Sequence, residues 1–133
     1  MLPFSITLRD GVPVYEQVTY AVTRAIVSGQ LRPGDLFPSV RTLSQELKIN
    51  PNTAHRIVAA LIEQGLLVVR PGIGTEVAAG RRPVPARRET LEDDVERLAV
   101  AARHAGWSLP DIVAAVRRHW ARLTSPRERE RHG

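Results

Sequence analysis

Four polar side chains close together in the middle of the chain are of the types that read nucleic acid. They are Asn52, Thr53, His55 and Arg56. An asparagine amide can pair with the edge of adenine, and an arginine guanidinium can pair with guanine, each through two hydrogen bonds. A threonine hydroxyl can hold a phosphate oxygen. This segment therefore carries the chemistry of a DNA-binding surface, and the alternative for each residue is an ordinary exposed helix position.

The chain offers little of the chemistry that an enzyme needs. It has no cysteine, which excludes disulfide bonds and thiolate catalysis. The sequence contains no recognisable nucleophile–base set, metal cluster or phosphate-binding loop. His104 and His119 are not spaced as metal ligands are. We therefore expect neither an enzyme nor a protein that carries a cofactor or a metal ion.

Three helices are expected to position the polar side chains. The first begins near Pro13 and ends at Gly29, the second follows Ser39, and the third follows Asn50. Ser39 and Asn50 are good N-caps, and Pro51 suits a first helical turn. The short break between the second and third helices is typical of a helix-turn-helix. Apolar residues at helical spacing give each helix one face to bury. They are Val14, Val18, Ala21, Val22, Ala25, Ile26, Val40, Leu43, Leu47, Ala54, Ile57, Val58, Leu61 and Ile62.

A β-hairpin is expected directly after the third helix, which ends at Gly65. Residues 66–70 and 75–78 have the composition of two short strands. Between them, the residues Pro-Gly-Ile-Gly at 71–74 supply a loop with glycines for positive backbone angles. Three helices followed by a hairpin form a winged helix-turn-helix domain, which we expect over residues 1–79. The fold class is therefore mostly α with a small β hairpin.

The rest of the chain is expected to form a tail. Residues 80–88 are rich in proline and arginine and are typical of a stiff linker. Residues 89–124 are expected to form two helices. Residues 125–133 are strongly charged, and we expect a disordered C-terminus there.

Each tail helix is expected to open with a capping box and to carry one apolar face. Thr90 pairs in this pattern with Asp93, and Ser108 with Asp111. Two isolated helices cannot bury such faces alone, so packing against a second copy is the natural outcome. We therefore expect a homodimer formed by the tail, and for its two tryptophans an interface core is favoured over a ligand cage. The expected interface residues are Leu91, Val95, Leu98, Ala102, Trp107, Ile112, Val116 and Trp120.

The positive charge of the chain is not concentrated where the DNA contacts are expected. The formal net charge is +5, but residues 1–80 hold seven basic and six acidic side chains, whereas residues 81–133 hold twelve arginines and eight acidic side chains. DNA binding by the first part must therefore depend on a few well-placed side chains. Part of the excess lies in four linker arginines, which are either solvated or in contact with DNA phosphates. They are Arg81, Arg82, Arg87 and Arg88.

Several specific motifs occur together within residues 13–77. They are Tyr15-Glu16-Gln17, the loop SGQLRPGDLFPSVR, the helix start NPNT and the glycine-bearing hairpin. In this combination the segment resembles the DNA-binding domain of GntR-family bacterial transcription regulators. The resemblance covers about half of the chain. It implies a sequence-specific, DNA-binding transcription regulator.

The length of the tail favours one subgroup of that family. Relatives with a sensing or an aminotransferase domain need a far longer second part than the residues that follow Val77 here. A short tail with two helices resembles the YtrA-like subfamily, whose members are small dimeric regulators, commonly repressors. The resemblance implies a dimeric repressor near its own operon. A two-fold dimer would bind an inverted-repeat operator with half-sites about one helical turn apart or slightly more.

The resemblance extends the expected DNA contacts beyond the third helix. In the family, the arginine of the PSVR motif contacts DNA, which implies this role for Arg41 beside Ser39. Relatives often have an arginine where this chain has His55, so their operator sequences do not transfer. In the hairpin, glycines allow the backbone to approach DNA closely. The expected contacts there are Arg70, Gly72, Gly74 and Thr75.

Other readings of the chain were weighed against DNA binding. A winged helix can also bind protein or RNA, but a protein-binding surface would be expected to carry an aromatic anchor in place of Arg41, Asn52 and Arg56. No apolar run approaches the ~20 residues of a membrane helix, and the N-terminus lacks a signal-peptide layout, so we expect a cytoplasmic protein. A small-molecule effector stays open, with the dimer interface or the junction of hairpin and tail as its possible places.

Overall fold

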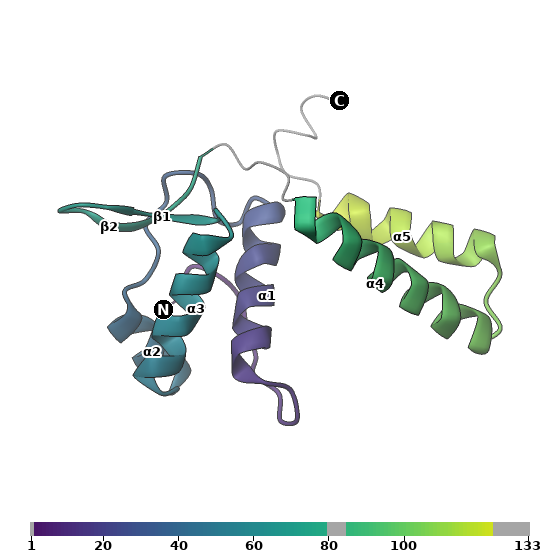
Figure 1. Ribbon diagram of the computed structural model, residues 1–133, viewed down its shortest axis with the longest axis horizontal. Coiled ribbons are helices and arrows are strands. Elements are labelled where there is room, and N and C mark those ends of the chain that lie inside the picture. Colours follow the sequence, from purple (N-terminus) through teal and green to yellow (C-terminus); the bar gives the residue numbers. More distant parts are fainter. Residues whose placement is uncertain (1, 80–84, 124–133) are drawn as a thin grey trace. The chain divides into compact units, whose positions relative to one another are not determined.

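The computed structural model describes residues 2–79 and 85–123 (Figure 1). These residues form two separate units, one with three helices and a hairpin and the other with two helices. The predicted fold class, a mostly helical winged helix-turn-helix followed by a two-helix tail, is confirmed. In chain order the elements are α1 (Val14–Val27), α2 (Val40–Leu47), α3 (Pro51–Glu63), β1 (Leu67–Arg70), β2 (Gly74–Val77), α4 (Pro85–His104) and α5 (Leu109–Leu123).

The two predicted caps define the helix-turn-helix. The Ser39 hydroxyl accepts a hydrogen bond from the Thr42 backbone N–H at 3.1 Å, and the Asn50 side-chain oxygen accepts one from the Asn52 N–H at 2.8 Å. Each bond satisfies an N–H group that the first helical turn leaves without a partner. Only residues 48–50 separate α2 from α3. This short break confirms the predicted start of α3.

The core of the first unit lies where α3 packs on α1 and α2 and leads into β1. Figure 1 shows α3 between the other two helices, with the hairpin at the end where α3 stops. The predicted apolar faces supply most of this core, and Phe4 and Phe37, which the helical pattern did not include, close one side of it. Their rings stack with centroids 5.9 Å apart. The buried residues are Phe4, Val18, Val22, Ala25, Ile26, Leu31, Phe37, Leu43, Ala54, Ile57, Val58, Leu61, Leu67 and Val77.

The hairpin is tied to the helices by the segment before α2. The strands β1 and β2 pair in an antiparallel register that matches Leu67 with Val77. On the other edge of β2, the Phe37 N–H donates to the Thr75 carbonyl at 2.8 Å, and the Val77 N–H donates to the Asp35 carbonyl at 2.9 Å. Residues 31–38 contain two prolines, and their sequence predicted neither helix nor strand. They nevertheless extend the hairpin by one short bridge, which holds it against the core.

The tail unit differs from the prediction at its start and agrees with it at its turn. Helix α4 begins at Pro85, so the linker predicted over 80–88 is wrong for residues 85–88, and Thr90 lies inside the helix instead of opening it. The second capping box is present. The Asp111 carboxylate accepts from the Ser108 backbone N–H at 2.9 Å, and the Ser108 hydroxyl accepts from the Asp111 N–H at 3.2 Å.

Candidate nucleic-acid interface

Helix α3 presents one fully buried face and one polar face. Ala54, Ile57 and Leu61 have no exposed surface, which fixes how the helix is rotated on the core. On the opposite side, Asn52 and Arg56 are exposed four residues apart, so their side chains neighbour each other on the helix surface. His55 is also exposed, and Thr53 is half-buried. The structure thus brings together the four polar residues predicted from the sequence.

Arg56 has a partner that sequence analysis did not identify. Its guanidinium carbon lies 5.2 Å from the centre of the Tyr15 ring, over its face. Tyr15 belongs to the first turn of α1 and is half-buried against the core. In the sequence, Tyr15 stands out only as part of the Tyr15-Glu16-Gln17 motif. A contact between two helices so far apart in sequence leaves no periodic signal from which it could have been predicted.

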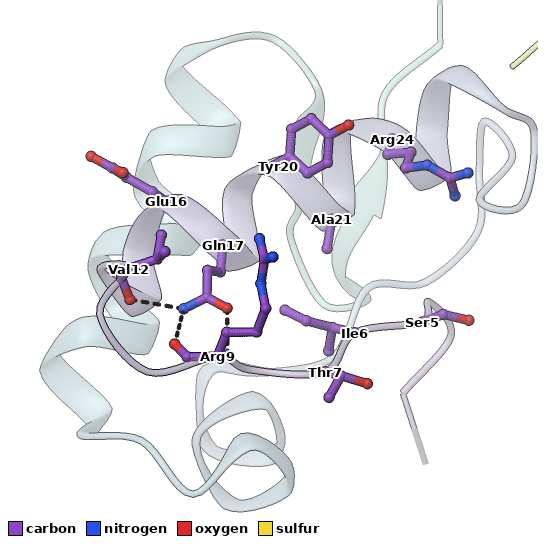
Figure 2. A pocket seen from close by; sticks show the side chains of 10 residues that line it. All are labelled: Ser5, Ile6, Thr7, Arg9, Val12, Glu16, Gln17, Tyr20, Ala21 and Arg24. Carbon is purple, nitrogen blue, oxygen red and sulfur yellow. Dashed lines mark hydrogen bonds between the residues drawn. The ribbon is translucent and has the colours of Figure 1, made fainter. Parts of the chain in front are cut away.

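The neighbouring Gln17 fixes the turn that leads into α1. Its side-chain oxygen accepts from the Arg9 N–H, and its amide nitrogen donates to the carbonyls of Arg9 and Val12, each at 2.8 Å (Figure 2). These three bonds hold residues 9–12 across the start of the helix. A shallow groove of about 310 Å³ lies between this lead-in segment and α1. Figure 2 shows the side chains that line it, among them the exposed Tyr20. The motif thus sets the start of α1, and with it the place of Tyr15.

The two predicted contact residues at the start of α2 differ in their surroundings, because the Ser39 side chain forms hydrogen bonds within the protein and the Arg41 side chain is exposed. The Ser39 hydroxyl is engaged in the cap and lies 3.0 Å from the Thr42 hydroxyl. Arg41 is exposed in the first turn of α2. Ser39 therefore holds the local geometry, and Arg41 is the cation that this helix start leaves exposed.

The hairpin supplies one further predicted cation, Arg70, but its guanidinium already has an ion-pair partner. The Arg70 Nε lies 3.4 Å from a Glu76 carboxylate oxygen. Gly72 and Gly74 have φ values of +77° and +126°, conformations in which any side chain would be strained. Thr75 is half-buried and its carbonyl accepts the bond from Phe37. The hairpin loop is shaped as predicted, whereas the Arg70 guanidinium already faces a carboxylate that would compete with a phosphate.

Comparison with known proteins connects this geometry to a family. The profile described as "Bacterial regulatory proteins, gntR family" matches residues 14–77, from the start of α1 to the end of β2. YhcF of Bacillus subtilis (strain 168), an uncharacterized HTH-type transcriptional regulator, is 32% identical over 87 residues, which cover 65% of this chain and 72% of YhcF. This chain belongs to the GntR family. As a GntR-family member it is a DNA-binding transcriptional regulator.

Similarity to GntR-family relatives continues past the hairpin. The HTH-type transcriptional repressor YtrA of Bacillus subtilis (strain 168) is 28% identical over 106 residues, which cover 78% of this chain and 82% of YtrA. A solved GntR family transcriptional regulator from Listeria monocytogenes superposes with a TM-score of 0.62 at 28% identity, covering 84% of this chain and 98% of that one. Because both matches are longer than residues 1–79, they include part of the tail. They agree with the predicted likeness to YtrA-like regulators.

The tail of this GntR-family chain leaves its apolar face uncovered. Within the described residues of the tail, Ala102 is the only one that is buried. Leu98 on α4 and Val116 on α5 are each 47% exposed. Ile112 is half-buried. The other six predicted interface residues are exposed, namely Leu91, Val95, Leu98, Trp107, Val116 and Trp120.

Two groups of residues with sequence predictions lie outside the part of the chain that the structure describes. Arg81 and Arg82, and the side chains of Arg87 and Arg88, lie outside the described residues, as do residues 125–133. Over the described ranges, no helix is both long and apolar enough to cross a membrane. The same ranges hold no group of three or more residues suited to bind a metal ion.

Proposed function

We propose that this chain is a dimeric repressor that binds an inverted-repeat operator near its own operon. One observation carries the proposal. Helix α3 is locked by a buried face, and its first turns offer Asn52, His55 and Arg56 to solvent. In a helix-turn-helix, the N-terminal part of the second helix meets base edges in the major groove.

The proposed contacts form three groups around α3. Asn52 and Arg56 pair with bases, with Thr53 and His55 beside them. Arg41 holds a phosphate from the start of α2, because its donor groups are exposed. The hairpin approaches the backbone of DNA through Gly72, Gly74 and Thr75, with Arg70 exchanging Glu76 for phosphate.

Dimerisation is proposed to use the exposed apolar face of the tail. Leu91, Val95 and Leu98 follow one stripe of α4, and Val116 and Trp120 lie on α5. Covering such side chains is favourable by about 25 cal/mol per Å² of apolar surface. A second copy provides an equal and complementary face, as two-fold symmetry requires. YtrA, which is similar over most of its length, is named a repressor, and this supports repression here.

Two further points, on enzymatic activity and on location, complete the proposal. The relatives named above are regulators, and we propose that this chain likewise has no enzymatic activity. We place it in the cytoplasm, where its DNA lies.

Selection of bound duplexes from a random-sequence pool tests the proposal. We expect an inverted repeat with half-sites about one helical turn apart, or slightly more, and a gel shift with the promoter of the chain's own operon. Arg56→Ala should weaken binding to the selected duplex by about 5- to 150-fold, which corresponds to the 1–3 kcal/mol of a base contact. Arg24→Ala, on the face of α1 that lines the groove of Figure 2, is the matched control and should leave binding unchanged. Absence of any sequence preference would contradict the proposal, and preferential binding of RNA would favour the RNA-binding alternative.

A further inference from the structure

We propose that Tyr15 positions the Arg56 guanidinium for DNA, by holding its flat face while leaving its hydrogen-bond donors free. The inference rests on the proposed DNA contact of Arg56 and adds a second residue, from α1, to that contact. Tyr15 itself is a positioning residue, since it acts through Arg56.

The geometry separates the face of the guanidinium from its edge. The 5.2 Å approach of its central carbon to the ring centre is a cation–π contact. A guanidinium carries its five N–H donors in its own plane, so stacking on the ring does not use them. Among the residues that the structure describes, no hydrogen bond or ion pair engages the Arg56 donors. They remain available to a base edge or a phosphate.

Tyr15 is itself held firmly, which makes it a useful support. It packs against the core, and its carbonyl accepts a bond from the Thr19 hydroxyl at 2.8 Å. The three bonds of Gln17 fix the turn directly before it. An arginine side chain is flexible, and ordering one on binding lowers affinity by about 2- to 10-fold. A ring fixed to the core removes part of that loss before DNA arrives.

Arg70 in the hairpin shows what a different partner would do. Its Nε lies 3.4 Å from a Glu76 carboxylate oxygen, and this ion pair offsets the positive charge. A phosphate must compete with that carboxylate. The Tyr15 ring orders Arg56 without such competition, because it neither accepts the N–H donors nor carries a charge.

A double-mutant cycle on the full chain tests the inference, with the duplex selected from the random pool as the probe. The variants are Tyr15→Leu, Tyr15→Phe, Arg56→Ala and the combination of Tyr15→Leu with Arg56→Ala. Tyr15→Leu should weaken binding about 2- to 10-fold, and Tyr15→Phe should restore parental affinity because it keeps the ring. In the Arg56→Ala background, Tyr15→Leu should have no further effect. Tyr20→Leu, another tyrosine of α1 but exposed on the groove, is the matched control and should bind as the parent does.

Two further readouts separate positioning from a general effect on folding. Tyr15→Leu should relax the base preference at the same position of the duplex as Arg56→Ala does, whereas a merely destabilised protein would bind all sequences more weakly. In the free protein, the Arg56 side-chain protons should show a ring-current shift that Tyr15→Phe retains, which requires no disruptive variant. Equal losses in Tyr15→Phe and Tyr15→Leu, additive losses in the cycle, or no effect of Arg56→Ala would each overturn the inference. If the parent chain shows no sequence preference, it is the proposed function that fails.

Discussion

Both units of this chain have apolar residues on their helices, but the two units differ in how far these side chains are buried. In the winged-helix unit, Val18, Leu43 and Leu61 have no exposed surface. In the described part of the tail unit, Ala102 alone is buried, and Leu109 and Trp120 are each 72% exposed. The first unit completes its core within one chain, whereas the second would reach a comparable core only in the proposed dimer. The stability of the first unit should therefore be independent of protein concentration, and that of the tail should depend on it.

The largest expected effect comes from opening a cavity in the closed core. Leu61→Ala removes a side chain with no exposed surface and should lower the free energy of unfolding of the winged-helix unit by about 2–5 kcal/mol. Amide exchange at Ile57 and Val58, on the same helix, measures this loss. Both tryptophans of the chain lie in the tail, so tryptophan fluorescence reports on the other unit.

The fluorescence transition gives the control for that prediction. It should be unchanged in Leu61→Ala and should move to higher urea concentration as the parent protein is concentrated. A tryptophan transition that is independent of protein concentration would contradict the comparison, because the tail would then be stable within one chain.

The next effect comes from placing a charge on the uncovered face of the tail. Val95 lies on the stripe shared by Leu91 and Leu98, and Val100 lies on the opposite side of the same helix. The two valines are 53% and 62% exposed. Val95→Glu should weaken the dimer by about a hundredfold or more, because an unpaired carboxylate would be buried, and sedimentation velocity measures the change. Val100→Glu is the matched control and should leave the dimer intact.

Loss of the dimer should also reduce operator binding, since one half-site then binds alone. Dissociation by both variants, or by neither, would show that the stripe is not the interface. Neither outcome would change the conclusion about the winged-helix unit, whose core residues come from one chain.

Local patterns predicted most of the elements because the forces that set them are local. Ser39, Asn50 and Ser108 cap their helices as expected. The predicted start of α4 was wrong because a second local signal lies before the predicted one. The capping pattern at Thr90 is valid locally, but Pro85 suits a first turn and is followed by residues that favour helix, so the helix starts earlier.

Contacts between distant segments were beyond such patterns. The stacking of Phe4 on Phe37 and the contact of Tyr15 with Arg56 join segments that are far apart in sequence. Neither contact produces a periodicity. The candidate site was thus predictable as a set of exposed side chains on α3, whereas the way in which α1 supports one of them required the structure.

A smaller effect is expected at the cap of α3. Asn50→Ala removes the acceptor of the Asn52 N–H and should cost about 0.5–2 kcal/mol of stability in the winged-helix unit, measured by amide exchange. Asn50→Asp keeps an acceptor and is the control. Because the tail is a separate unit, its fluorescence transition should be the same in both variants, and a shift there would indicate that the units are coupled.

The smallest effect concerns the cap of α5, where the tail depends on local bonds in place of a core. The Ser108 backbone N–H, and then its hydroxyl, lower the pKa of Asp111 from its ordinary value. Because the folded pKa is the lower one, the carboxylate stabilises the start of α5 above the ordinary aspartate pKa, and this contribution is lost as pH falls through the lowered pKa. In an NMR titration, Asp111 of the folded chain should titrate at lower pH than in an unstructured peptide of residues 107–113. Ser108→Ala should raise its pKa only part of the way, since the backbone N–H remains. A full return to the peptide value would mean that the hydroxyl, and not the backbone, holds the carboxylate.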